Sequence, residues 1–126
     1  MRMKQKGNPT SLTDEERQAL IEFVEKLLQR FDGRLLSAIL FGSRARGEAG
    51  PDSDMDVLVV VDSDDLQVRK EIRHLAVEVW LEHGIYLSTR VWSRAHLREL
   101  EGLQTMLFRN IERDGIDLLQ LAAGSK

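Results

Sequence analysis

Two short motifs and an apolar run decide the fold: LFGSRARG at residues 40–47, SDMD at 53–56 and VLVVV at 57–61. Residues 35–41 are apolar enough for a strand, and Gly42 then supplies the backbone freedom that a tight turn requires. Residues 54–61 predict a second strand. It is apolar on both faces past Asp56, which indicates a position inside the sheet rather than at its edge.

The turn and the second strand carry groups that suit a nucleotide. Gly42 has no Cβ, so the backbone can approach a bulky ligand closely. Ser43 opens a turn whose hydroxyl and free N–H groups can hold phosphate oxygens. Asp54 and Asp56 alternate along the strand, so both carboxylates point to one face, with Cα atoms roughly 6–7 Å apart. Two hard oxygen ligands beside a phosphate-binding turn predict a site for Mg²⁺ and a nucleoside triphosphate.

This stretch resembles the nucleotidyltransferase superfamily related to DNA polymerase β, whose signature is Gly-Ser, a spacer of about ten residues, then Asp-x-Asp. Here ten residues separate Ser43 from Asp54. The form GSRARG with SDMD is similar to the minimal nucleotidyltransferase (MNT) branch, small proteins that are often antitoxins encoded beside a HEPN-domain toxin. The resemblance covers residues 41–61. It implies an α+β nucleotidyltransferase core, a small mixed sheet flanked by helices.

The resemblance also implies a reaction and the residues that perform it. The reaction is Mg²⁺-dependent transfer of a nucleoside monophosphate, AMP from ATP, to an acceptor hydroxyl. The implied catalytic residues and metal ligands are Asp54 and Asp56, and the implied nucleotide-binding residues are Gly42, Ser43 and Arg46. Arg44 competes with Arg46 for the contact to the triphosphate, and a solvated surface role is open for either arginine.

The family's third acid, which sits on the next core strand, has no counterpart here. Residues 85–92 predict that strand and contain no carboxylate, and either Ser88 or Arg90 stands near the expected position. A third acid would help to bind the catalytic metal and to deprotonate the acceptor hydroxyl. Glu78 and Glu82 lie upstream and are better read as solvated charges on a helix. We therefore expect nucleotide binding with slow or partner-dependent transfer.

The remaining elements follow from caps and apolar spacing. The sequence predicts a first helix from the Thr13–Glu16 capping box to about residue 30, and a second over 66–83, with Trp80 in its buried stripe and a stop at Gly84. A third helix is expected from residue 94, capped by Ser93, with a candidate break at Gly102. A helix over 106–113 and an apolar tail over 116–121 follow.

Length and composition set limits on the class of protein. The 126 residues predict a disordered leader at 1–10 and a single nucleotidyltransferase domain at 11–126. The formal net charge of −3 makes nucleic acid an unlikely partner, because binding to a phosphate backbone needs clustered cations. No membrane span or signal peptide is expected, and with no cysteine a cytoplasmic location is expected. The sequence is compatible with an oligomer as well as with a monomer.

The sequence assigns structural roles, rather than catalytic ones, to the histidines and the large aromatic residues. His74, His83 and His96 do not form a helical i, i+4 pair, so surface positions are expected for all three. Trp80, Trp92 and Phe108 are read as anchors in the core or at a partner's surface.

Three classes of function remain from the sequence. The first is an ATP-using nucleotidyltransferase acting on a protein hydroxyl, as on a HEPN toxin. The second is a catalytically weak or inactive nucleotide-binding antitoxin that acts by direct contact. The third is transfer to a small molecule, which ordinarily needs a second domain for the acceptor pocket.

Overall fold

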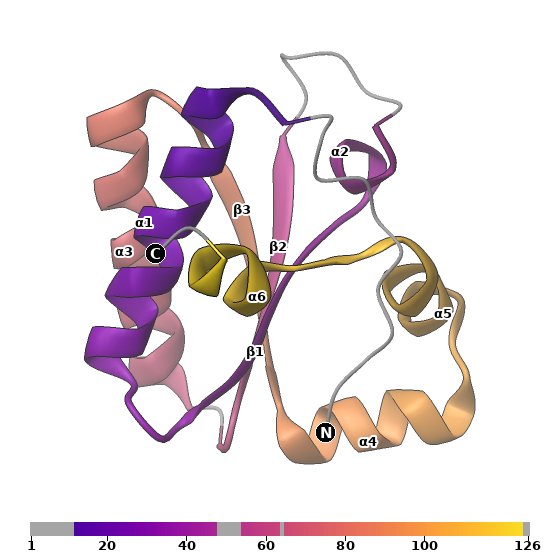
Figure 1. Cartoon of the computed structure of the whole chain (residues 1–126). Coiled ribbons are helices and arrows are strands. Elements are labelled where there is room, and N and C mark those ends of the chain that lie inside the picture. Colours follow the sequence, from indigo (N-terminus) through magenta and orange to yellow (C-terminus); the bar gives the residue numbers. More distant parts are fainter. Residues whose placement is uncertain (1–11, 48–53, 64, 125–126) are drawn as a thin grey trace.

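A computed structural model describes residues 12–47, 54–63 and 65–124. The predicted leader at 1–10 and the predicted loop at 48–53 lie outside these residues. The elements, drawn in Figure 1, are α1 (Asp14–Arg30), β1 (Leu35–Phe41), α2 (Ser43–Arg46), β2 (Met55–Val61), α3 (Leu66–His83), β3 (Leu87–Ser93), α4 (Arg94–Leu103), α5 (Met106–Asp114), β4 (Ile116–Asp117) and α6 (Leu118–Ala123). None of the helices in the described part of the chain is both long enough and apolar enough to cross a membrane.

The four strands form one mixed sheet in the order β3-β2-β1-β4. β1 runs antiparallel to β2 and to β4, whereas β2 and β3 are parallel. The interior position predicted for β2 is therefore confirmed, as is the α+β fold with a small mixed sheet. In Figure 1 the end of β1, α2 and the start of β2 lie together at the upper end of the sheet.

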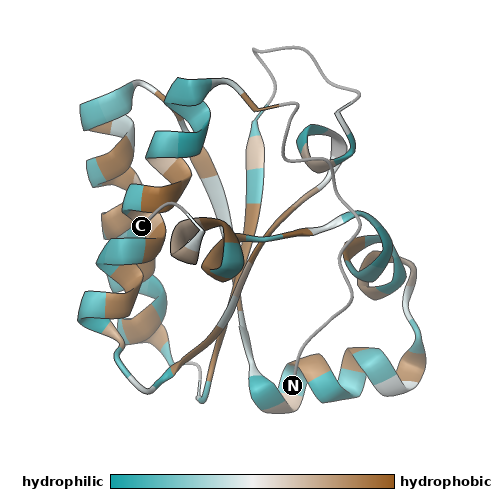
Figure 2. Ribbon diagram, in the orientation of Figure 1, coloured by the Kyte–Doolittle hydropathy of each residue, from teal (hydrophilic) through white to brown (hydrophobic). Residues whose placement is uncertain are grey.

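Helices cover both faces of the sheet, and each face has its own core. α1, α3 and α6 pack on the face that receives Met55, Val57 and Val59 of β2. α4 and α5 pack on the opposite face, against Leu58 and Val60. Figure 2 shows the brown, apolar sides of these helices turned toward the strands. Because side chains alternate along β2, Asp56 belongs to the same face as Leu58 and points toward the α4–α5 side.

The predicted helix caps are present. The Thr13 hydroxyl accepts a hydrogen bond from Glu16 N at 3.0 Å, and the Glu16 carboxylate accepts one from Thr13 N at 2.8 Å. Gly84 ends α3 in the left-handed region, with φ of 71°. Ser93 caps α4 by accepting from His96 N at 3.1 Å. These local signals fix the helix ends independently of the tertiary packing.

Two details of the sequence prediction are wrong. Trp80 is not in the buried stripe of α3: it is 48% exposed and packs edge-to-face on Tyr86, with ring centroids 5.6 Å apart. The stripe runs through Val79 instead, and a neighbouring residue is turned by about 100° around the helix. Gly102 does not break α4, which continues to Leu103 and ends at Gln104, whose φ is 50°.

Candidate active site

The glycine turn at the end of β1 is in direct contact with a carboxylate of β2. Gly42 has φ of +81°, and the N–H groups of Ala45 and Arg46 donate to its carbonyl oxygen at 3.1 and 3.3 Å, which starts α2. A Cβ placed on Gly42 would lie 2.7 Å from Asp56 Oδ2. A residue with a side chain therefore fits this turn only if Asp56 moves. Ser43 follows as the first residue of α2, and its predicted hydroxyl contact lies outside what the structure describes.

The two predicted acids lie at the head of the central strand. Asp54 is exposed and immediately precedes β2, while Asp56 is half-buried between Phe41 of β1 and Ser88 of β3. Burial raises the pKa of the Asp56 carboxyl, and the neighbouring Asp54 charge raises this pKa further, against a lowering effect of Arg90. The two carboxylates are thus close enough to repel one another.

The charge of this pair suits a divalent cation. Among the described residues, neither the Asp54 nor the Asp56 carboxylate takes part in a hydrogen bond or an ion pair, in contrast to the carboxylates of Asp62 with Arg34 and Asp114 with Arg113. Adjacent carboxylates without cationic contacts are the oxygen ligands that Mg²⁺ takes in phosphate-transfer sites. The residues present therefore fit the metal that the motif predicts.

The neighbouring strand provides no third acid. β3 lies beside β2 as predicted, with Ser88 opposite Asp56 and Arg90 opposite Leu58. This register settles which of the two candidates is adjacent to Asp56: it is Ser88. Arg90 is one row further along the strand and acts on Asp56 through its charge. β3 itself carries no carboxylate.

The two arginines of α2 have different surroundings. Arg44 is buried and forms an ion pair with the buried Glu16 of α1, which joins α2 to α1. Arg46 is partly exposed, and its Nη1 lies 3.9 Å from Asp114 Oδ2 at the end of α5. Glu16 and Asp114 were not predicted as partners, because 28 and 68 residues separate them from the arginines. Arg46 is the arginine whose side chain reaches solvent, which favours it over Arg44 as the ligand of the triphosphate.

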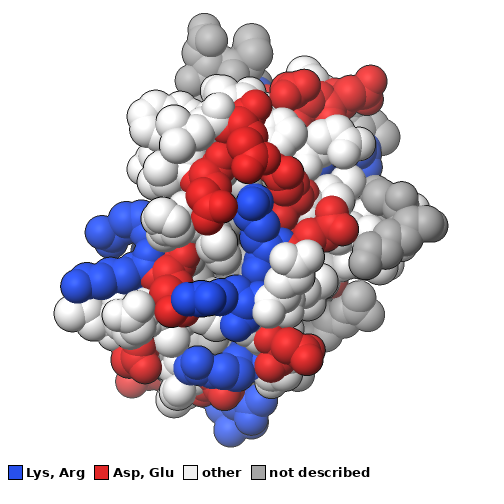
Figure 3. Space-filling model, turned by 90° about the vertical axis from the view of Figure 1, so that its left-hand side faces the viewer, with Lys and Arg blue, Asp and Glu red and all other residues white. Residues whose placement is uncertain are grey.

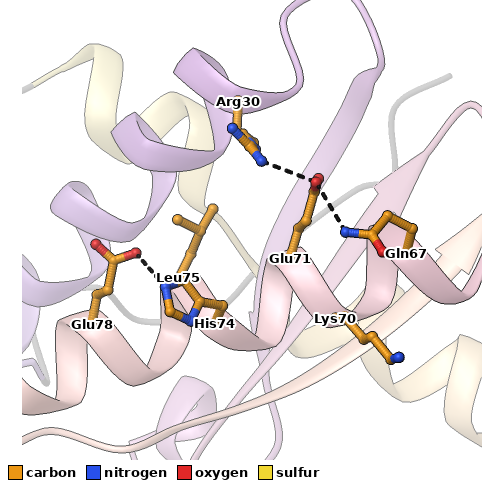
Figure 4. Close-up of a pocket in the computed structure, with 7 residues that line it drawn as sticks. All are labelled: Arg30, Gln67, Lys70, Glu71, His74, Leu75 and Glu78. Carbon is orange, nitrogen blue, oxygen red and sulfur yellow. Dashed lines mark hydrogen bonds and ion pairs between the residues drawn. The ribbon is translucent and has the colours of Figure 1, made fainter.

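The histidines and a groove along α3 lie apart from the residues of this site. His74 and His96 are at the surface as predicted, but His83 is partly buried between Glu15 and Glu22 of α1. A groove of about 520 Å³ is lined by α3 residues and Arg30 (Figure 4). Ion pairs across it, Arg30–Glu71 at 3.0 Å and His74–Glu78 at 3.5 Å, already use its polar groups. It contains none of the predicted site residues.

A glycine turn ends one strand of the mixed sheet and lies against the second of two alternating aspartates on the adjacent strand. This arrangement defines a site of the nucleotidyltransferase class. The sequence profile of the nucleotidyltransferase domain family matches residues 20–117. The chain belongs to this family, and the family and the enzyme class predicted from the motifs are confirmed.

Two relatives come from Methanocaldococcus jannaschii. The candidate protein adenylyltransferase MJ0604 is 36% identical over 78 residues, which are 62% of this chain and 74% of MJ0604. The candidate protein adenylyltransferase MJ1305 is 39% identical over 72 residues, 55% of this chain and 49% of MJ1305. The match thus spans about half the length of the second relative.

Among solved structures, a mutant of the toxin-antitoxin MntA-HpeT is similar in fold. It aligns with a TM-score of 0.51 and 20% sequence identity, covering 83% of this chain and 82% of that one. At this identity the likeness concerns the fold alone.

A Gly42→Ala variant is expected to lose at least about tenfold in affinity for Mg²⁺–ATP, because its Cβ must displace the Asp56 carboxylate. The left-handed φ adds a stability cost of about 1–2 kcal/mol. Gly33→Ala is the matched control: its φ is +78°, yet its Cβ would meet nothing within 4 Å. Calorimetric titration with Mg²⁺–ATP and urea unfolding of both variants separate the two effects. Equal nucleotide affinity in the two variants would contradict the close approach.

Proposed function

We propose that the chain transfers AMP from Mg²⁺–ATP to a hydroxyl of a partner protein. The observation that carries the proposal is the contact between the Gly42 turn and Asp56, with Asp54 close enough to affect the pKa of Asp56. This arrangement joins a place for phosphate oxygens to a pair of metal ligands. The relatives described as candidate protein adenylyltransferases support both the nucleotide and the class of acceptor.

Each residue of the site has a part in this proposal. Asp54 and Asp56 hold Mg²⁺, which when bound neutralises charge on the triphosphate and the attacking oxygen. The backbone after Gly42, the Ser43 hydroxyl and the Arg46 guanidinium bind and orient the triphosphate. Asp114 keeps Arg46 near the end of α5. The acceptor oxygen attacks the α-phosphorus, the bond from that phosphorus to the bridging oxygen breaks, pyrophosphate leaves, and the hydroxyl proton passes to solvent.

A protein acceptor is supported by an exposed aromatic pair at the same end of the sheet. Trp80 is 48% and Tyr86 49% exposed, and their rings pack edge-to-face. Tyr86 directly precedes Leu87, which pairs with Met55 next to Asp54. Exposed aromatic side chains are typical anchors of protein interfaces. A partner seated on this pair would contact the end of the sheet that carries the two aspartates.

The biological role that we propose is that of an antitoxin whose acceptor is a HEPN-type toxin. The motif resemblance and a fold shared with a toxin-antitoxin protein support this role. The test is transfer of label from [α-³²P]ATP to the product of a neighbouring HEPN reading frame. Label on that protein that requires both Mg²⁺ and Asp56 is the expected result. Label on small-molecule hydroxyls, with none on the protein, would contradict the role.

The second candidate is a nucleotide-binding antitoxin that acts by contact and transfers AMP slowly or not at all. The observation in its favour is Ser88, a neutral residue, opposite Asp56 where the family has an acid. The two candidates differ in one measurement: a contact antitoxin blocks its toxin equally well in the presence of ATP and of an analogue whose α,β-bridging oxygen is replaced by a methylene group, which cannot donate AMP.

A Ser88→Asp variant is expected to transfer AMP at least about tenfold faster than the wild type, because a third carboxylate beside Asp56 adds a metal ligand and a proton acceptor. Arg90→Asp tests the other candidate position: Arg90 is opposite Leu58 and one row away from Asp56, so a carboxylate there is expected to accelerate transfer less than one at position 88. The initial rate of label transfer is the measurement. A wild type that is already as fast as Ser88→Asp would show that two carboxylates suffice.

A further inference from the structure

A second group of potential metal ligands lies between α1 and α3, apart from the site at Asp54 and Asp56. Glu22 comes from α1, and Glu82 and His83 come from the last turn of α3. One carboxylate oxygen of each glutamate and one imidazole nitrogen all lie within 4.8 Å of one another. The three side chains are 35%, 49% and 19% exposed, so an ion from solvent can reach them.

The imidazole is already oriented for coordination. His83 Nε2 lies 2.7 Å from Glu22 Oε2, and its Nδ1 lies 3.1 Å from Glu15 Oε1. A metal-bound histidine almost always donates its second N–H to a carboxylate or a carbonyl, and Glu15 is in place to accept it. The inner nitrogen, Nε2, is therefore the one that faces the two glutamates.

The local charge also favours a cation. Figure 3 shows acidic side chains gathered on the upper part of the face formed by α1 and α3. Lys26 is the cation nearest to Glu82, at 3.8 Å, but it is closer to Glu78, at 3.4 Å. A divalent ion bound by Glu22, Glu82 and His83 leaves the Lys26–Glu78 pair intact.

We propose that Glu22, Glu82 and His83 form a site for Zn²⁺ or a similar borderline divalent cation, which links α1 to α3. One nitrogen and two carboxylate oxygens are a ligand set that zinc accepts, with a fourth position left to water. Mg²⁺ prefers oxygen ligands alone and is excluded by the histidine. The bound ion stabilises the packing of the two helices on the sheet, because it joins the middle of α1 to the last turn of α3. This site is independent of the proposed nucleotidyl transfer.

The test uses the full chain without an affinity tag, freed of metal and then titrated with ZnCl₂ in a mildly alkaline buffer. Calorimetry is expected to show a zinc site that depends on His83. At a free zinc concentration 100-fold above Kd, the melting temperature is expected to rise by roughly 10 °C. Glu15→Gln is expected to weaken binding by about 10–100-fold, as an outer partner of the histidine.

Matched variants decide between this site and other zinc binding. His83→Ala and Glu82→Gln are expected to abolish the thermal shift. His74→Ala is the control, since His74 pairs with Glu78 on the exposed face of the same helix. An Asp54→Asn/Asp56→Asn protein is also expected to keep the shift.

Three results would overturn the site: no thermal shift in the wild type, an equal shift in His83→Ala, or a shift lost with His74 or with the two aspartates. If His83→Ala does not fold, Glu82→Gln decides, because that side chain is half exposed and contributes little to the core.

Discussion

An Asp56→Asn protein is expected to transfer AMP at least about 100-fold more slowly than the wild type, the order of loss seen when one charge-stabilising group is removed from an active site. It is expected to melt at or above the wild-type temperature. The reason is that Asp56 is half-buried beside Asp54 and its carboxylate, among the described residues, makes no hydrogen bond or ion pair. Removing its charge relieves repulsion without breaking a contact, so activity and stability should change in different directions.

Asp62→Asn is the matched control, because Asp62 lies just beyond the other end of β2 and is exposed, with its carboxylate 3.1 Å from Arg34 Nε. This variant is expected to keep the transfer rate. Transfer of label from [α-³²P]ATP and thermal melting are the two measurements. Comparable transfer rates for Asp56→Asn and Asp62→Asn would show that Asp56 is not part of the active site. A strongly destabilised Asp56→Asn protein would show that Asp56 has a structural role instead.

Breaking the ion pair between Glu16 and Arg44 is expected to destabilise the fold by about 3–5 kcal/mol, since it removes an opposite charge from beside a buried charged side chain. Both side chains are less than 10% exposed. Glu16 also closes the capping box of α1, so the two effects must be separated. Glu16→Gln retains a capping side chain and removes only the charge, whereas Glu16→Ala removes both and should cost about 1 kcal/mol more.

Urea unfolding of Glu16→Gln, Arg44→Met and the double variant gives the coupling energy. The double variant is expected to be less destabilised than the sum of the single variants, because neither buried charge then remains alone. Strictly additive losses would show that the two side chains do not stabilise one another. The pair also holds α2 against α1, so Arg44→Met should lower nucleotide affinity even in conditions where the protein stays folded.

Local signals in the sequence were sufficient for most of the fold. Thr13, Gly84 and Ser93 end or begin helices through bonds to residues three or four positions away, so their roles can be read from spacing alone. The apolar run of β2 identified the central strand, and the ten residues between Ser43 and Asp54 are the basis of the proposed site. The position of β3 beside β2 was also predicted, and the structure adds that the two strands are parallel, because the helix between them returns the chain to the same end of the sheet.

Features that depend on contacts between distant residues could not be predicted. The sequence pattern placed both Val79 and Trp80 in the buried stripe, and only the packing of α3 decides that Val79 is buried while Trp80 is exposed. Arg44 looks like a second phosphate ligand until Glu16 is seen beside it. His83 was expected at the surface because its partners, Glu15 and Glu22, come from a helix about 60 residues earlier in the chain.

The most direct test of the account is a crystal structure with Mg²⁺ and a non-hydrolysable ATP analogue. We expect the triphosphate against the turn that begins at Gly42, within reach of Arg46, and the metal bound by Asp54 and Asp56. A groove of about 480 Å³ near β3, lined by Arg69, Arg73 and Arg90, is the strongest competing place for an anion. A triphosphate in that groove, with no metal between the aspartates, would contradict the assignment of the active site.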